Sequence, residues 1–381
     1  MKGIILAAGK GSRLYPMTRP VCKPLLPVYD KPMIYYPLAV LLEAGIRDIL
    51  IIIPPGEEGP FYRLLGSGGR LGVNITYEVQ EVARGIADAL LIGSQFIGND
   101  DVCLVLGDNI FYSPKFGGYL KQALQHREGA CVFGYYVDDP RAFGVVEFDA
   151  QGRAVSIEEK PKEPKSTLAS MGIYIFSWKK LRKYLEEDEA NSKSSNDFGK
   201  DIIPAMLANG EKMVSYRFEG YWKDVGTIES LWEANMDLLS PNSGLNLSDD
   251  SWKIYGRTTG SPPHFTAKGA KVQHTLLSEG CEIAGNVSES VLFSDVKVAK
   301  NANVEYSILM PGAVVEEGAN VRYAIVASGA VIAKGASIGA GPSECDVDKW
   351  GVAVVAENVR IGENVKLAAK EMADEDIPDA E

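Results

Sequence analysis

The chain has 381 residues, a length that suits two domains, and its hydrophobic content of 46% is ordinary for a globular protein. Its formal net charge of −12 argues against nucleic acid or an anionic membrane surface as a partner. No apolar run reaches the roughly 20 residues that a membrane helix needs, and a strand pattern opens the chain where a signal peptide would stand. Five scattered cysteines without CxxC spacing are typical of reduced thiols in a cytoplasmic protein, and they argue against a disulfide framework or a zinc site.

The first predicted strand, residues 3–6, runs into a loop of small residues, AAGKGS, that Arg13 closes. Backbone N–H groups in such a loop can approach a phosphate closely, because few bulky side chains stand in the way. A second cation, Lys23, lies in a stiff segment between prolines. The loop fits neither the P-loop pattern nor the Rossmann pattern, where Leu14 would replace the third glycine. The strand, the loop and the two cations indicate a nucleoside triphosphate ligand; a tight strand-to-helix turn is the alternative.

The segments that follow alternate between strand and helix patterns. Continuous apolar runs suit strands that are buried on both faces, and helical segments separate them. This alternation predicts a doubly wound α/β domain with a mostly parallel sheet, whose ligands lie beyond the carboxyl ends of the strands. The predicted helices are 34–44, with Gly45 as a C-cap, and 86–97; the predicted strands are 48–53, 74–79 and 102–106.

Composition changes near residue 240, and a repeat follows. Residues 240–265 are rich in Pro, Ser, Gly and Asn, which is typical of a linker. Beyond them, aliphatic residues recur with a period of 17, as at Val287, Val304, Val321 and Ile338. Three short sides per turn, each with an inward aliphatic residue, describe a parallel β-helix; an irregular β-sandwich is the alternative. We therefore divide the chain into a first domain at 1–240, a linker at 241–265, a β-helix at 266–368 and a frayed acidic tail at 369–381.

The N-terminal stretches LAAGKGSRLYPMT, from residue 6, and KPLLPVYDKPMIYYPL, from residue 23, resemble the signature of the sugar-1-phosphate nucleotidyltransferases. Up to about residue 165 the chain looks most like glucose-1-phosphate thymidylyltransferases, through VLGDNIFY and FGVVEFDAQGRAVSIEEKP. From about residue 168 it looks like bacterial glucose-1-phosphate adenylyltransferases, through ASMGIYIF, NDFGKDIIP and GYWKDVGTIESLWEANMDLL. The resemblance implies that the β-helix is left-handed and that the chain is an enzyme of nucleotide-sugar biosynthesis.

The resemblance also implies how this chain handles a triphosphate. Arg13 matches the cation that neutralises the β- and γ-phosphates, and Lys23 the one that approaches the α-phosphate. Asp108 and Asp224 match the two aspartates that bind Mg²⁺. An isolated aspartate after a strand is usually a turn residue, but the surrounding motifs favour the metal interpretation. The remaining residues that match nucleotide-binding positions are Leu6, Ala7, Ala8, Gly9, Gly11, Ser12, Gln80 and Gly85.

The sugar phosphate is assigned in the same way. Glu159 matches the residue that accepts hydrogen bonds from glucose hydroxyls, and Lys160 the residue that holds the 1-phosphate. Gly144 matches a glycine that lets backbone contact the sugar. Ser170 and Asp197 match two further positions on the sugar side.

The implied reaction is a single displacement, in which a phosphate oxygen of glucose 1-phosphate attacks the α-phosphorus of the nucleotide and expels pyrophosphate. The N-terminal base pocket favours dTTP or UTP, since the Gln80 amide can pair with a pyrimidine edge. ATP stays open, because ARGIADA from residue 83 echoes an adenylyltransferase. A non-catalytic regulatory subunit and an acyltransferase are the competing classes. We expect a cytoplasmic homo-oligomer, a tetramer or a dimer.

Overall fold

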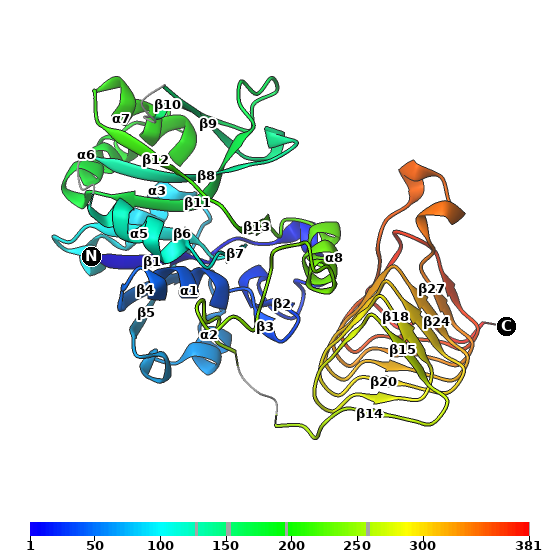
Figure 1. Ribbon diagram of the computed structural model, residues 1–381. Coiled ribbons are helices and arrows are strands. Elements are labelled where there is room, and N and C mark those ends of the chain that lie inside the picture. The colour runs from blue at the N-terminus through cyan, green and yellow to red at the C-terminus, as the bar shows by residue number, and fades with distance from the viewer. Residues whose placement is uncertain (126–128, 150–153, 195–196, 257–259, 381) are drawn as a thin grey trace. The chain divides into compact units, whose positions relative to one another are not determined.

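The computed structural model describes residues 1–125, 129–149, 154–194, 197–256 and 260–380 (Figure 1). The chain forms two compact units. The predicted linker, 241–265, is divided between the units and contains residues 257–259, which lie outside the described residues, as does Glu381 of the predicted tail. The first unit comprises Met1–Lys10, Met33–Asp224 and Asn246–Ile254, and the second comprises Gly11–Pro32, Val225–Leu245 and Tyr255–Glu381.

A nine-stranded sheet forms the centre of the first unit (Figure 1). Its strand order is β10-β9-β11-β6-β1-β4-β5, with β8 beside β11 and β12 beside β8. The run β6-β1-β4-β5 is parallel, as the sequence predicts, but β11 is antiparallel to β6, β8 and β9, so the sheet is mixed. The strands are β1 (Lys2–Leu6), β4 (Asp48–Ile53), β5 (Asn74–Val79), β6 (Val102–Leu106), β8 (Ala130–Tyr136), β9 (Gly144–Phe148), β10 (Ala154–Glu159), β11 (Leu168–Phe176) and β12 (Met213–Arg217).

Helices cover both faces of this sheet, because its central strands are apolar on both sides. On one face, α3, α6 and α7 pack on side chains such as Leu50 and Leu104. On the other, Leu41 of α1 lies against Gly3, where a Cβ would stand 2.8 Å from its Cδ1. The helices of this unit are α1 (Tyr35–Glu43), α2 (Glu58–Leu65), α3 (Ile86–Ile92), α4 (Ser94–Ile97), α5 (Phe116–Gln125), α6 (Trp178–Glu189) and α7 (Ile203–Ala208).

The helix predicted over 86–97 is divided into α3 and α4 at Gly93. Gly93 lies so close to the sheet that a Cβ on it would stand 2.9 Å from Ile4 Cδ1 and 3.2 Å from Leu50 Cδ2. The close approach needs a residue without a side chain, and glycine weakens a helix interior. The break therefore reflects packing against strands that are distant in sequence.

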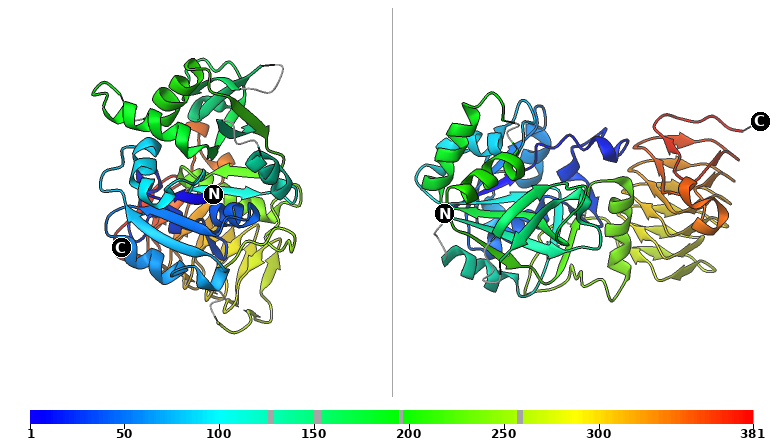
Figure 2. Two further views of the ribbon diagram at one scale, coloured as in Figure 1. Left: turned by 90° about the vertical axis from the view of Figure 1, so that its left-hand side faces the viewer. Right: turned by 90° about the horizontal axis from the view of Figure 1, so that it is seen from above.

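The second unit contains the parallel β-helix that the 17-residue repeat predicts. Its three six-stranded parallel sheets form three faces, and the coils stack along one axis (Figure 2). Val287 pairs with Val304, Val304 with Val321, and Val321 with Ile338, and all four are buried. The architecture is that of a left-handed parallel β-helix. Its strands are β14 (Phe265–Thr266), β15 (Lys271–Gln273), β16 (Leu276–Leu277), β17 (Glu282–Ile283), β18 (Asn286–Ser288), β19 (Val291–Leu292), β20 (Lys297–Val298), β21 (Asn303–Glu305), β22 (Ile308–Leu309), β23 (Val314–Val315), β24 (Asn320–Arg322), β25 (Ala324–Val326), β26 (Val331–Ile332), β27 (Ser337–Ile338), β28 (Ala353–Val355), β29 (Arg360–Ile361), β30 (Lys366–Leu367) and β31 (Met372–Ala373).

The acidic tail is ordered over its described residues, so the expectation that it frays is wrong. Within it, β31 pairs with β28, and Ile377 forms a parallel bridge with Ile361. Ala380 N donates to the carbonyl of Glu363 at 2.9 Å. The tail continues the hydrogen-bonded ladder of the last coil. This backbone pairing keeps the tail ordered despite its acidic composition.

The second unit also holds the hairpin of β2 (Pro27–Val28) and β3 (Lys31–Pro32), and helix α8 (Ile228–Met236). Tyr29, in the hairpin turn, has a φ of 53°, a left-handed conformation that is uncommon for a bulky residue. Three contacts hold it there. Its N–H donates to Oδ1 of fully buried Asn235 of α8 at 2.8 Å, its hydroxyl reaches the carbonyl of Leu277 at 3.4 Å, and its ring lies edge-on to Phe293.

Candidate active site

The carboxyl end of β1 lies beside that of β6 in the first unit. Gly107 N, just after β6, donates to the carbonyl oxygen of Leu6 at 2.8 Å. A Cβ on Gly107 would stand 2.9 Å from that oxygen and 3.2 Å from Ala7 Cα, so only glycine allows this approach. The loop that begins at Ala7 and Ala8, both buried, therefore starts next to Asp108. In an α/β sheet this edge is where ligands bind.

The predicted metal-binding aspartates come together although they lie far apart in sequence. Asp224 ends β13 (Tyr221–Asp224), which pairs antiparallel with β7 (Asn109–Tyr112), and Asp224 stands directly opposite Asn109. Buried Asn109 donates from Nδ2 to Asp108 Oδ1 at 2.8 Å and accepts from Trp222 Nε1 at 2.8 Å. The Asn109 amide thus fixes one carboxylate and binds the strand that carries the other.

The carboxylates of these two aspartates fit a divalent metal that takes its remaining ligands from phosphate oxygens and water. Asp108 and Asp224 are both half-buried. Among the described residues no cluster of three or more His, Cys, Asp or Glu side chains could hold a metal alone. Mg²⁺ is commonly bound through one or two carboxylates together with substrate phosphates and water, which matches this donor set.

The predicted sugar-side residues form a second cluster in the first unit. Gly144 pairs with Glu159 across β9 and β10, and a Cβ on Gly144 would stand 3.0 Å from Glu159 Oε2 and 3.8 Å from Ser170 Cβ. Asp197 Oδ1 caps the following helical turn by accepting from Gly199 N at 2.9 Å, and Gly199 in turn lies beside Glu159. Residues from three other parts of the sequence, Gly144, Ser170 and the turn at Asp197–Gly199, therefore gather near the Glu159 carboxylate.

Burial raises the pKa of the Glu159 carboxyl, and the charge of Asp197 adds to that effect. The Lys160 ammonium, 3.5 Å from Glu159 Oε1, lowers the pKa and offsets part of the shift. Lys160 itself has a φ of 49° and an exposed side chain. A partly desolvated carboxylate beside an exposed cation suits hydroxyls on one side and a phosphate on the other.

We expect Glu159→Gln to stabilise the protein while it weakens sugar phosphate binding. Because the pKa of folded Glu159 is raised, ionising it costs stability as pH rises above the ordinary pKa of glutamate, and the full cost persists above the raised pKa. The variant should therefore melt higher than wild type at pH 7, and this gain should vanish at a pH below the ordinary glutamate pKa. Loss of charged hydrogen bonds should lower kcat/KM for glucose 1-phosphate by about 10- to 100-fold. Melting curves across pH test the first effect, and a gain that persists in acid would contradict it.

Gln80 and Gly85 lie past the carboxyl end of β5. Gln80 continues the ladder, since its backbone N–H donates to the carbonyl of Ile53 at 2.9 Å, and its side chain is buried. Gly85, with a φ of 95°, precedes α3. Leu6 is half-buried at the end of β1, and Gly9 is exposed, with open space where a Cβ would stand. These residues share the carboxyl edge of β1-β4-β5.

The predicted cations belong to the second unit. A Cβ on Gly11, whose φ is 61°, would stand 2.9 Å from Thr18 Cγ2 and 3.0 Å from Lys23 Cβ, so the loop packs tightly on the stem of Lys23. Lys23 is only 6% exposed and opens a short 3₁₀ turn, Lys23–Leu25. Ser12 and Arg13 are exposed. The convergence of Arg13 and Lys23 with Asp108 and Asp224 on one polyphosphate stays a prediction.

Three side chains at this site were not predicted from the sequence. Asn109 and Trp222 lie in the motifs that supplied Asp108 and Asp224, so adjacency in the motif was the available signal. Buried Asp88, in α3, accepts from Gln80 Nε2 and pairs with Arg84. The spacing of four residues between Arg84 and Asp88 was the sequence signal for that ion pair.

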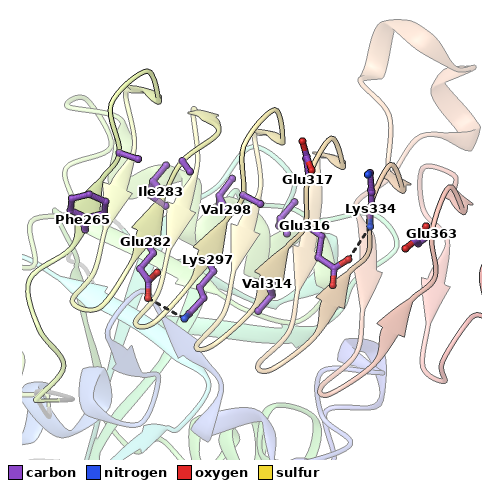
Figure 3. Close-up of a pocket in the computed structure, with 14 residues that line it drawn as sticks. Phe265, Glu282, Ile283, Lys297, Val298, Val314, Glu316, Glu317, Lys334 and Glu363 are labelled. Atoms are coloured by element: carbon purple, nitrogen blue, oxygen red, sulfur yellow. Dashed lines mark hydrogen bonds and ion pairs between the residues drawn. The ribbon is translucent and has the colours of Figure 1, made fainter.

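A groove of about 520 Å³ lies on the outer face of the sheet β14-β17-β20-β23-β26-β29 (Figure 3). Two of its acidic side chains have partners on neighbouring coils. Lys297 Nζ lies 3.0 Å from Glu282 Oε1, and Glu316 accepts from the backbone N–H of Lys334 at 3.1 Å. The residues predicted to bind the substrates are not among those that line this groove.

Comparison with known proteins agrees with both architectures. Residues 2–241 match the nucleotidyl transferase family, and residues 263–355 match the GlmU-like C-terminal hexapeptide family. No helix among the described residues has the length and apolar character to span a bilayer.

Two groups of relatives cover the chain differently. A glucose-1-phosphate thymidylyltransferase of Neisseria meningitidis is 52% identical over 235 residues, which are 61% of this chain and 81% of the relative. A glucose-1-phosphate adenylyltransferase of Clostridium botulinum is 40% identical over 325 residues, 78% of this chain and 81% of the relative. A thymidylyltransferase of Mycolicibacterium smegmatis is 47% identical over 240 residues, 62% of this chain and 81% of the relative. The chain therefore belongs to the nucleotidyl transferase family and is a nucleotidyltransferase that carries a C-terminal hexapeptide β-helix.

Proposed function

We propose that this enzyme joins a nucleoside triphosphate to glucose 1-phosphate and releases NDP-glucose and pyrophosphate, with dTTP or UTP as the nucleotide. The observation that carries the proposal is the pairing of β13 with β7, which sets Asp224 opposite Asn109 and beside Asp108. That pair lies next to the start of the small-residue loop, so carboxylates and a phosphate-binding loop share one edge of the sheet.

The sugar cluster would hold and orient glucose 1-phosphate. Glu159 would accept from glucose hydroxyls, Gly144 leaves room for the sugar beside that carboxylate, and Ser170 and Asp197 would line the same pocket. Exposed Lys160 would bind the 1-phosphate. Holding both reactants in one geometry converts a bimolecular step into a unimolecular one, which supplies much of the rate enhancement in such reactions.

In the reaction, a phosphate oxygen of glucose 1-phosphate forms a bond to the α-phosphorus, and the bond from that phosphorus to the bridging oxygen of pyrophosphate breaks. The sugar phosphate is already ionised at neutral pH, so no general base is required. We assign Arg13 to the β- and γ-phosphates and Lys23 to the charge that develops at the α-phosphate. Asp108 and Asp224 would hold Mg²⁺, which when bound neutralises phosphate charge and orients the triphosphate.

Two nucleotides have support. A stretch of 235 residues, 61% of the chain, is 52% identical to a thymidylyltransferase, and this favours a pyrimidine nucleotide. ATP is the second candidate, because the relatives that cover 78% of the chain are adenylyltransferases.

Pyrophosphate release from dTTP, UTP, ATP, CTP and GTP in turn, with glucose 1-phosphate and Mg²⁺ present, tests the proposal. We expect the highest kcat/KM with dTTP or UTP. A preference for ATP would replace the pyrimidine assignment with ADP-glucose synthesis. Absence of release with all five nucleotides would refute the enzymatic proposal and favour a regulatory subunit.

We further propose that the enzyme acts in the cytoplasm, where nucleotides and sugar phosphates are available, without nucleic acid or a membrane as a partner. We also propose that it assembles as a homo-oligomer, a tetramer or a dimer, since a solenoid presents flat faces to a second copy.

A further inference from the structure

Two buried polar side chains sit at the carboxyl end of β5. Gln80 is 3% exposed and Asp88 is 6% exposed. Gln80 Nε2 donates to Asp88 Oδ2 at 2.7 Å and lies 3.2 Å from the carbonyl oxygen of Gly85. Arg84 pairs with the other oxygen of Asp88. Buried polar groups that are fully partnered hold one arrangement, because each alternative leaves a group unsatisfied.

This network fixes which end of the Gln80 amide is available. A carboxylate and a carbonyl oxygen only accept hydrogen bonds, so the group that faces both must be the NH₂. Its two N–H bonds are then used by Asp88 and Gly85. Gln80 Oε1 accepts no hydrogen bond from the described residues. It is also not one of the fully buried side-chain atoms without a partner, so it keeps some exposed surface. The amide therefore has an acceptor, and no donor, left for a ligand.

The chemistry of an acceptor-only amide distinguishes among pyrimidines. Thymine and uracil carry a ring N–H at N3, which would donate to Oε1. Cytosine has a lone pair at N3, which would face the oxygen and be repelled. The sequence predicts only that the Gln80 amide can pair with a pyrimidine edge. In the structure the amide oxygen is left for that pairing, because Asp88 and Gly85 accept from both amide N–H bonds.

We infer that Asp88, supported by Arg84, is a positioning residue. It sets base selectivity by holding the Gln80 amide so that Oε1 faces the nucleotide. The inference rests on the proposed function, in which the base lies beside Gln80. It assigns the site to bases with a ring N–H, thymine or uracil, over cytosine.

Asp88→Asn tests this role. Asparagine can donate to Gln80 Oε1, so the Gln80 amide can turn over and its NH₂ can face the base. In the full-length protein, kcat/KM from pyrophosphate release and Kd from calorimetry would be measured for dTTP and dCTP. We expect the dTTP preference over dCTP to fall by about 10- to 100-fold, the range for one misdirected buried hydrogen bond. If kcat/KM and the affinity fell by the same factor for dTTP and dCTP, Asp88 would act only in folding, and the inference would be overturned.

A second probe changes the nucleotide. N3-methyl-dTTP lacks the ring N–H, so wild type should use and bind it at least about 10-fold less well than dTTP, and Asp88→Asn should discriminate less between the two. If wild type uses dCTP as well as dTTP, or binds the two equally, the inference is wrong.

Asp48→Asn is the matched control, because Asp48 also accepts from an amide, Asn74 Nδ2, and from a cation, Lys2 Nζ, both at 2.9 Å. Asp48 opens β4 at the opposite edge of the sheet, so its replacement should leave the dTTP to dCTP ratio unchanged. If no nucleotide yields pyrophosphate, the proposed reaction fails, whereas the ratio of Kd values still decides the role of Asp88.

Discussion

Asp108→Asn is expected to lower kcat/KM for pyrophosphate release by about 10³-fold, the largest effect of any single change considered. Charge stabilisation by a bound metal is worth several kcal/mol, and each 1.4 kcal/mol corresponds to about tenfold in rate. Asparagine keeps an oxygen that can accept from the Asn109 amide, so the local hydrogen bond should survive. Steady-state kinetics over a range of Mg²⁺ concentrations measure the effect, and the variant should melt close to wild type.

Asp101→Asn is the control for that variant. Asp101 precedes β6, at the opposite end of the strand that Asp108 follows, so the same chemical change falls on the same strand away from the site. It should leave kcat/KM and its Mg²⁺ dependence unaltered. Wild-type turnover by Asp108→Asn would remove Asp108 from the metal site.

Lys23→Met should lower kcat by about 10²- to 10³-fold and raise KM for the nucleotide much less. A cation directed at charge that develops in the transition state contributes this much, and it contributes little to ground-state binding. Methionine retains much of the buried stem of Lys23, on which Gly11 packs, so the fold should be preserved. Separate kcat and KM values for the nucleotide show whether Lys23 acts mainly in the transition state.

Lys31→Met provides the comparison for Lys23. Lys31 is also buried, at 8% exposure, and its ammonium pairs with the neighbouring Asp30 carboxylate. If burial of a lysine stem were the only contribution of Lys23, the two variants would lose activity to a similar extent. An unchanged kcat for Lys23→Met would remove this residue from the transition-state contacts.

The β-helix could be predicted because each coil pairs with the next coil in the sequence. Val287, Val304 and Val321 are one coil apart in sequence and one strand apart in space, so periodicity alone gives the pairing. The two aspartates could be found only through motif resemblance. Nothing in the spacing of Asp108 and Asp224 indicates that β7 and β13 are neighbours.

Features that depend on a distant partner could not be predicted. The helix break at Gly93 reflects packing on β1 and β4, and the ordered tail reflects backbone pairing with the coil before it. The orientation of the Gln80 amide required knowing that Asp88 is buried against it. In each case a contact outside the local sequence pattern decided the structure.

The grouping of Gly11–Pro32 with the β-helix has a consequence for recombination between relatives. Tyr29 joins the segment that bears Arg13 and Lys23 to Asn235 of α8 and to Leu277 and Phe293 of the solenoid. A crossover near residue 240 that replaced only the solenoid would exchange the residues at two of the three contacts of Tyr29, those with Leu277 and Phe293. Solenoids should therefore be exchanged successfully only between parents that match at these positions, so that this early segment of the chain is inherited together with its far end.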